Sequence, residues 1–99
     1  QAPIRFDFED LLHLSASELE AVLREVDANV LVLALTGSSE ELVDRIAERM
    51  PRRSAKEFRR RLRRFGPTRL SDVEMAQRAV TGVAVRRMGA RRFGAMAIG

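Results

Sequence analysis

Cysteine, tryptophan and tyrosine are all absent from this 99-residue chain. Without cysteine, disulfide bonds and thiolate metal sites are excluded, and a reducing compartment is compatible with the sequence. Five phenylalanines are the only aromatic residues, so aliphatic side chains have to supply most of the packing. No apolar run approaches the roughly 18–20 residues that a membrane-spanning helix needs, and the first residues lack the basic and apolar regions of a signal peptide. The sequence therefore predicts a soluble domain without redox chemistry.

Charge is present in quantity but is unevenly distributed along the chain. Residues 1–50 carry four basic and eleven acidic groups, residues 51–70 carry nine and one, and residues 71–99 carry five and two. The formal net charge is +4, so the excess of positive charge is concentrated in one segment of twenty residues. Such an asymmetry points to an acidic protein partner, an anionic membrane surface or nucleic acid.

Helical periodicity dominates the chain, and the alternation and hairpin signals of strands are missing. Three S-x-x-E capping boxes predict helix starts, because serine accepts a bond from a free backbone N–H and glutamate reaches back. They are Ser15 with Glu18, Ser38 with Glu41, and Ser71 with Glu74. We predict an all-α fold, a compact single domain of six helices over residues 6–93. Residues 1–5 are expected to be an extended hinge or linker remnant of a longer protein, and residues 94–99 a short tail.

Residues 52–65 are predicted to form an amphipathic helix of unusual charge. At 100° per residue, one arc is apolar and the opposite arc is basic. The apolar arc contains Ala55, Phe58, Leu62 and Phe65, and the basic arc contains Arg52, Arg53, Lys56, Arg59, Arg60, Arg63 and Arg64. Like charges at helical spacing cost roughly 0.2–0.5 kcal/mol per pair, which Glu57 alone cannot offset. The pattern therefore favours a binding surface over an ordinary solvated face.

Three stretches of sequence resemble the C-terminal domain of the FliG family of flagellar motor switch proteins. They read FDFEDL from Phe6, VLREVD from Val22 followed by LALTG from Leu33, and GPTRLSDVEMAQ from Gly66. Each is short, but their order and spacing agree across about 85 residues. The resemblance implies a six-helix domain of the armadillo-like, right-handed superhelical kind, whose fifth helix faces the stator of the motor. The basic helix at residues 52–65 corresponds to that fifth helix.

The same resemblance implies a site for partner proteins. Arg53 and Arg69 match positions at which the family uses basic residues in the rotor–stator contact, and neighbouring charges are expected to support them: Arg52, Lys56, Arg59 and Arg64. The implied partners are a stator protein of the MotA type through its cytoplasmic loop, switch-complex proteins of the FliM type, and further copies of the full-length protein in a ring. The implied location is the cytoplasmic side of the inner membrane, in the flagellar basal body.

Several positions depart from the family pattern. Thr36 stands where the family often has lysine, and Arg60 and Arg61 stand where it typically has an acidic pair. The sign of the local charge is thus reversed, which calls for a stator loop of reversed charge or for another partner. Phe6 and Phe8 match the aromatic positions of the family's hinge motif and are expected to act in a hinge.

Catalysis and cofactor binding are not predicted. No phosphate-binding loop, dinucleotide fingerprint or zinc-protease motif occurs, and Ser54 has no nearby histidine to activate it. His13, the single histidine, has no second metal ligand of its kind and is expected to pack in an apolar setting. We predict no enzyme activity, no catalytic or metal site, no cofactor and no small-molecule substrate. Met75, like the other methionines, is expected to fill the core.

The sequence is compatible with three functions. In the first, the chain is a rotor module that transmits torque through its charged helix and takes part in switching of the rotation direction. In the second, it is a basic helical module that binds another acidic protein, nucleic acid or an anionic membrane. Nucleic acid would then be bound without sequence specificity, because the basic arc lacks interleaved aromatic residues. In the third, it is a paralogue that assembles rings without touching a stator.

Overall fold

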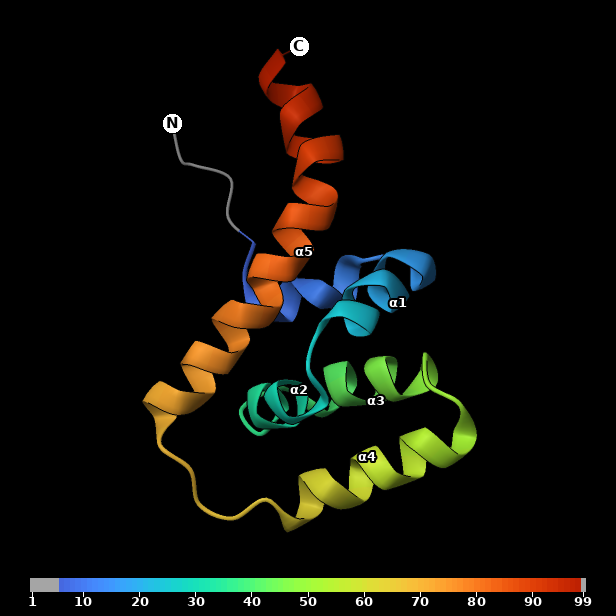
Figure 1. Cartoon of the computed structure of the whole chain (residues 1–99), viewed down its shortest axis with the longest axis vertical. Coiled ribbons are helices and arrows are strands. Elements are labelled where there is room, and N and C mark those ends of the chain that lie inside the picture. Colours follow the sequence, from blue (N-terminus) through green and yellow to red (C-terminus); the bar gives the residue numbers. More distant parts are fainter. Residues whose placement is uncertain (1–5, 99) are drawn as a thin grey trace.

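A computed structural model of the chain describes residues 6–98, and the surroundings of side chains up to residue 87. Over residues 6–98 it contains six helices and no strand, which confirms the predicted all-α fold (Figure 1). In chain order they are the 3-10 helix η1 (Phe8–His13), α1 (Ala16–Glu25), α2 (Ala28–Leu35), α3 (Glu40–Glu48), α4 (Arg52–Arg64) and α5 (Leu70–Ile98).

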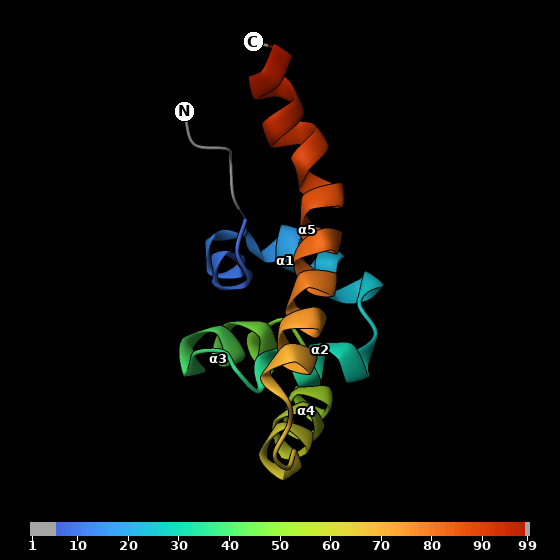
Figure 2. The same ribbon diagram turned by 90° about the vertical axis from the view of Figure 1, so that its left-hand side faces the viewer.

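The long helix α5 is the axis on which the others are arranged. Its most extensive contacts are with α2, and α1 and η1 pack further along it. The basic helix α4 packs against α2 and α3, and it lies at the end of the molecule opposite the C-terminal part of α5 (Figures 1 and 2). One long side of α4 is consequently left to solvent.

The core is aliphatic, as the shortage of aromatic residues predicts. Side chains from all six helices form one cluster, and Phe8 and Phe58 are the phenylalanines buried in it among the side chains that the structure describes. The largest fully buried side chains are Leu11, Leu14, Leu19, Val22, Val32, Leu42, Ile46 and Val80. No polar or charged residue is buried among the side chains that the structure describes. Hydrophobic burial is therefore what holds the helices together.

The first predicted capping box is confirmed. Ser15 Oγ accepts a hydrogen bond from the backbone N–H of Glu18 at 3.2 Å, and the backbone N–H of Ser15 donates to Glu18 Oε1 at 2.9 Å. Both members of the box therefore satisfy a backbone donor that the helix start would otherwise leave without a partner.

The second predicted box is wrong by one residue. The N-cap of α3 is Ser39, whose Oγ accepts from the backbone N–H of Leu42 at 3.2 Å. Ser38 Oγ instead donates to the carbonyl oxygen of Leu35 at 3.1 Å, closing the end of α2. The choice between the two serines is made by η1, since the Glu9 carboxylate accepts bonds from Ser39 N at 3.2 Å and from Ser39 Oγ at 2.7 Å.

The third predicted box is also wrong, because α5 begins at Leu70 and Ser71 already lies in its first turn. The carbonyl oxygen of Arg69 accepts bonds from the backbone N–H groups of Asp72 and Val73, at 3.0 and 3.2 Å. At its other end α5 continues to Ile98. The division into a domain that ends at residue 93 and a tail over residues 94–99 stays a prediction.

Two side chains expected in apolar surroundings are exposed. Met75 is 62% exposed, on the side of α5 away from the buried Val73 and Ala76. His13 ends η1 and is exposed. In both cases the helix has one packed side only, and no neighbouring element covers the other.

A candidate cationic interface on α4

Helix α4 is amphipathic in the structure as the sequence predicts. Phe58 is buried, and Ala55 and Leu62 are partly buried against the core. Phe65, the fourth residue of the predicted apolar arc, is 39% exposed, so this part of the prediction is wrong. The helix ends at Arg64, and the extended ψ angle of Phe65 (φ −65°, ψ 120°) turns the following residues away from the helical path.

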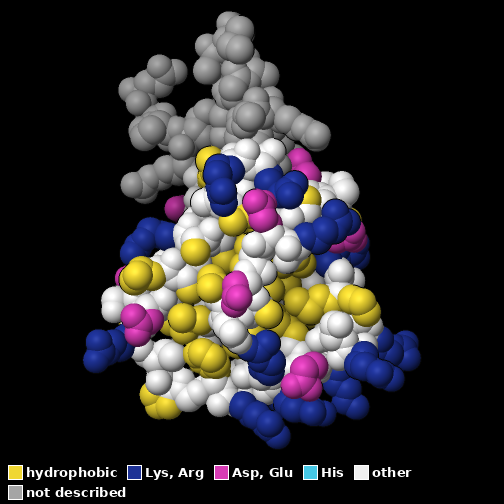
Figure 3. All heavy atoms as spheres, viewed as in Figure 1, with side chains coloured by type: hydrophobic (Ala, Val, Ile, Leu, Met, Phe, Trp, Pro, Cys, Tyr) yellow, Lys and Arg dark blue, Asp and Glu magenta, His cyan; other side chains and the backbone are white. Residues whose placement is uncertain are grey.

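The outer side of α4 is a dense cationic surface. The helix contains eight basic residues and one acidic residue. Six of the eight are exposed: Arg52, Arg53, Lys56, Arg60, Arg63 and Arg64. Basic side chains line the lower edge of the face seen in Figure 3. We call these six residues the α4 cationic surface.

Few acidic groups offset this charge. Arg59 pairs with Asp44 of α3 at 2.9 Å, and Arg60 pairs with Glu57 of α4 itself at 3.3 Å. The other five residues of the α4 cationic surface make no ion pair or hydrogen bond with the described residues. Exposed pairs such as these are worth about 0.2–1 kcal/mol each. The surface therefore presents four guanidinium groups and the ammonium group of Lys56 without an acidic partner among the described residues. These groups are available to bind an acidic partner protein.

Arg60 and Arg61 are adjacent in sequence, but their side chains lie on different sides of α4. Arg60 is exposed and bonded within its own helix, whereas Arg61 is half-buried and donates a hydrogen bond to Asn29 Oδ1 of α2. Successive residues are separated by about 100° around a helix, so the two side chains cannot point the same way. Of the predicted arginine pair, only Arg60 belongs to the outward surface.

Two further predicted site residues lie off α4. Arg69 is exposed in the segment between α4 and α5. Thr36 ends α2, where its hydroxyl donates to the carbonyl oxygen of Leu33 at 2.7 Å. The adjoining Gly37 lies so close to α5 that a Cβ there would be 3.1 Å from Val73 Cγ1. Thr36 is thus placed beside α5, and it takes no part in the α4 cationic surface.

The two predicted hinge residues contribute to packing. Phe8 is 7% exposed in the core, and Phe6 is partly buried against it. Between them Asp7 caps η1, where its backbone N–H donates to Asp10 Oδ2 at 2.8 Å. The rings anchor the start of the described chain, and their action in a hinge stays a prediction.

Sequence reasoning did not find the hollow on the inner side of α4. A groove of about 600 Å³ lies between α1, α2 and α4, with an apolar floor and charged edges. Hydrophobic side chains are visible on this face above the basic lower edge (Figure 3). The groove could not be predicted from the apolar stripe of any single helix, because it is formed by the way in which three helices pack against one another.

Other kinds of site find no support in the described part of the chain. No group of three or more histidine, cysteine, aspartate or glutamate residues there could hold a metal ion. No helix among the described residues has both the length and the hydrophobicity to cross a membrane. The exposed large hydrophobic side chains described are Phe65, Leu70, Met75 and Val85.

Comparison with protein families gives one match that spans most of the chain. The model of the FliG C-terminal domain matches residues 4–92. The flagellar motor switch protein FliG of Thermotoga maritima is 43% identical over 83 residues, which are 84% of this chain and 24% of that protein. FliG of Pseudomonas aeruginosa is 40% identical over 83 residues, 84% of this chain and 25% of that protein. The chain thus spans about a quarter of the length of these relatives.

Solved structures show the same likeness in three dimensions. Full-length FliG from Aquifex aeolicus superposes with a TM-score of 0.81 and 34% identity, covering 88% of this chain and 27% of that one. A fragment of FliG from Helicobacter pylori, residues 86–343, also gives a TM-score of 0.81, with 28% identity and coverage of 85% and 40%.

Proposed function

Because this chain belongs to the FliG C-terminal domain family, we propose that it is a rotor module of a flagellar motor switch and that the α4 cationic surface is its contact with the stator. The partner would be the cytoplasmic loop of a stator protein of the MotA type. The observation that carries the proposal is the set of exposed basic residues on one side of α4, five of which have no acidic partner among the described residues.

The charge of the α4 cationic surface specifies the chemistry of the partner. Positive potential attracts an acidic loop and repels a basic one. Arg60 reverses the local charge, because it is exposed and stands where the family typically has an acidic residue. We therefore propose that the stator loop recognised by this chain presents aspartate or glutamate to α4.

Weak and salt-sensitive pairing suits a contact that forms and breaks as a rotor turns. Individual exposed ion pairs contribute about 0.2–1 kcal/mol, and at about 0.15 M salt charges are screened over about 8 Å. Torque would then pass through several weak contacts in succession. Participation in switching, binding of FliM-type proteins, ring formation by the full-length protein and a position on the cytoplasmic side of the inner membrane belong to the same proposal.

The proposal is tested by measuring the affinity of this chain for the cytoplasmic loop of its own stator protein as a function of salt. Arg60→Glu should weaken binding about fivefold at low salt, and the difference should shrink as salt is raised. Arg86→Glu is the matched control, since it changes the charge equally at an exposed position of α5. Equal losses in both variants, or no binding by the unmodified chain at low salt, would contradict a specific contact at α4.

A second candidate function is a basic module for nucleic acid or another polyanion, favoured by the same free arginines. The single aromatic residue within α4, Phe58, is buried, and one exposed ring, Phe65 at the end of the helix, does not make a row of rings on which successive bases could stack. Binding to DNA would therefore be purely electrostatic and should disappear well below physiological ionic strength. DNA binding that persists at about 0.15 M salt would favour this second candidate.

A further inference from the structure

The groove on the inner side of α4 has an apolar floor built by all three of its helices and the turn before α4. The floor consists of Leu23, Val26, Leu31, Met50 and Phe58. Three of these, Leu23, Val26 and Met50, pack on the core but keep part of their surface exposed. At about 600 Å³, the space is in the range of sites that accept a few large side chains.

The edges of the groove carry an excess of positive charge. Four arginines and two glutamates line it: Arg24, Arg49, Arg53, Arg61, Glu20 and Glu57. Glu20 lies between two arginines, 3.9 Å from Arg24 and 3.7 Å from Arg49. Glu57 pairs with Arg60, outside the groove. A net charge of +2 (four minus two) therefore surrounds an apolar floor.

The two terminal stretches of this sequence lack the acidic residues that would complement the groove. Residues 1–5 and 75–99 contain no aspartate or glutamate, so these stretches do not offer the complementary charge. A second copy does not match either. Its most acidic helix, α3, has its apolar residues Leu42 and Ile46 fully buried in its own core. Exposing them to fill the groove would unfold the copy that supplies them.

We propose that this groove between α1, α2 and α4 binds an amphipathic α-helix of a partner protein whose apolar side is bordered by aspartate and glutamate. Apolar side chains at i, i+3, i+4 and i+7 of such a helix would cover the floor. Its acidic side chains would meet Arg24 on one edge and Arg53 on another. This site shares Arg53 with the stator contact proposed above, but each has an arginine of its own: Arg60 lies outside the groove, and Arg24 lies outside the α4 cationic surface.

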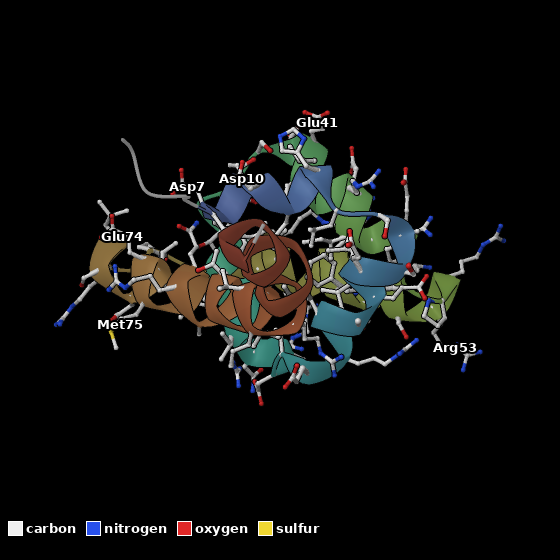
Figure 4. All side chains as sticks on the ribbon, turned by 90° about the horizontal axis from the view of Figure 1, so that it is seen from above. Asp7, Asp10, Glu41, Arg53, Glu74 and Met75 are labelled. Atoms are coloured by element: carbon white, nitrogen blue, oxygen red, sulfur yellow. The ribbon has the colours of Figure 1, made fainter. Side chains whose placement is uncertain are left out.

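A designed peptide provides the probe. It is a labelled helix of about 16 residues with leucine at the anchor positions and glutamate beside them. The control peptide has the same composition in an order that gives no apolar side. Binding is followed by fluorescence anisotropy and by the methyl NMR signals of Met50, in the groove, and Met75. Met75 is the internal reference, since it lies outside the groove and on the opposite side of the molecule from Arg53 in the view of Figure 4.

We expect the amphipathic peptide to bind more tightly than the control and to shift the Met50 signal while leaving Met75 in place. Arg24→Glu should weaken peptide binding about fivefold, whereas Arg60→Glu should leave it within about twofold. The Arg24 side chain is 77% exposed, so its replacement does not disturb the core. For the stator loop we expect the opposite result: Arg60→Glu should weaken its binding, and Arg24→Glu should not. The two variants therefore distinguish failure of the groove proposal from failure of the proposed stator contact.

Three results would overturn the proposal. The first is equal affinity for the two peptides, and the second is a shift at Met75 without one at Met50. The third is a Met50 shift that appears without peptide as the protein concentration rises, because the occupant would then be a second copy of the chain. The NMR result on the unmodified chain decides the question even if a variant folds poorly.

Discussion

The guanidinium group of Arg61 on α4 donates a hydrogen bond to Asn29 Oδ1 at the start of α2, and so ties the basic helix to the neighbour on which it packs. Asn29 itself is held at the helix start, where its backbone N–H donates to Asp27 Oδ1 at 2.8 Å. Helical spacing places Arg61 off the basic arc of α4, and the bond holds it at an edge of the groove. The bond thus joins two helices through residues 32 positions apart in the chain.

This link should be measurable as a coupling energy. In a double-mutant cycle, Asn29→Ala and Arg61→Ala should each lower the free energy of unfolding, and the coupling should be about 0.5–1.5 kcal/mol. Thermal and urea unfolding provide the measurement. Asn29→Ala combined with Arg60→Ala is the control, and that pair should be additive because Arg60 bonds to Glu57 instead. Coupling in the control pair would show that the effect is general electrostatics.

The two adjacent serines before α3 should differ in importance. Ser39→Ala removes the N-cap and the bond to Glu9, so it should cost about 1–2 kcal/mol of stability. Ser38→Ala removes one weak bond at the end of α2 and should cost less than about 0.5 kcal/mol. Urea unfolding of the two variants compares them directly. If Ser38→Ala proves the more harmful, the helix begins where the sequence pattern predicts.

The two phenylalanines of the α4 region form a second matched pair. Phe58→Ala leaves a cavity in the core and should cost about 3 kcal/mol or more. Phe65→Ala acts on a side chain that is 39% exposed and should cost less than about 1 kcal/mol. Calorimetric unfolding tests both. Similar losses would mean that Phe65 lies in the core with the rest of the predicted apolar arc.

Two glycines should respond in opposite directions to alanine. Gly82 lies inside α5 with open space where a Cβ would stand, so Gly82→Ala should stabilise by about 0.5–1 kcal/mol. Gly37→Ala would place a methyl group 3.1 Å from Val73 Cγ1, and Val73 is buried and cannot easily move. We expect this variant to be destabilised. The melting temperatures of the two variants test this prediction. A stabilised Gly37→Ala variant would show that α2 and α5 leave room for a methyl group at this position.

Local patterns in the sequence were sufficient to predict the fold class and the character of α4. The helical spacing of Leu19 and Val22 and the capping box at Ser15 each depend on residues three or four apart, and each is present in the structure. The basic side of α4 follows from the same spacing. The family resemblance, carried by motifs that span most of the chain, agrees with the match over residues 4–92.

The predictions that were wrong concern features that depend on residues far apart in sequence. Ser38 and Ser39 are both acceptable caps by local rules, and Glu9 of η1 selects between them. Met75 has a suitable side chain for the core, but whether a helix side is covered depends on which other helix reaches it. The groove beside Arg24 likewise belongs to no single helix.

The sequence by itself determined that the chain is all-helical, that its core is aliphatic and that one helix carries most of the positive charge. These properties follow from composition and from contacts within one or two helical turns, which are encoded locally. Only the tertiary structure decided which residues of other helices pair with Arg59 and Arg61, which serine begins α3 and where a groove remains open. Each of these is set by packing between helices, where side chains about 30 positions apart compete for the same hydrogen bonds and the same space.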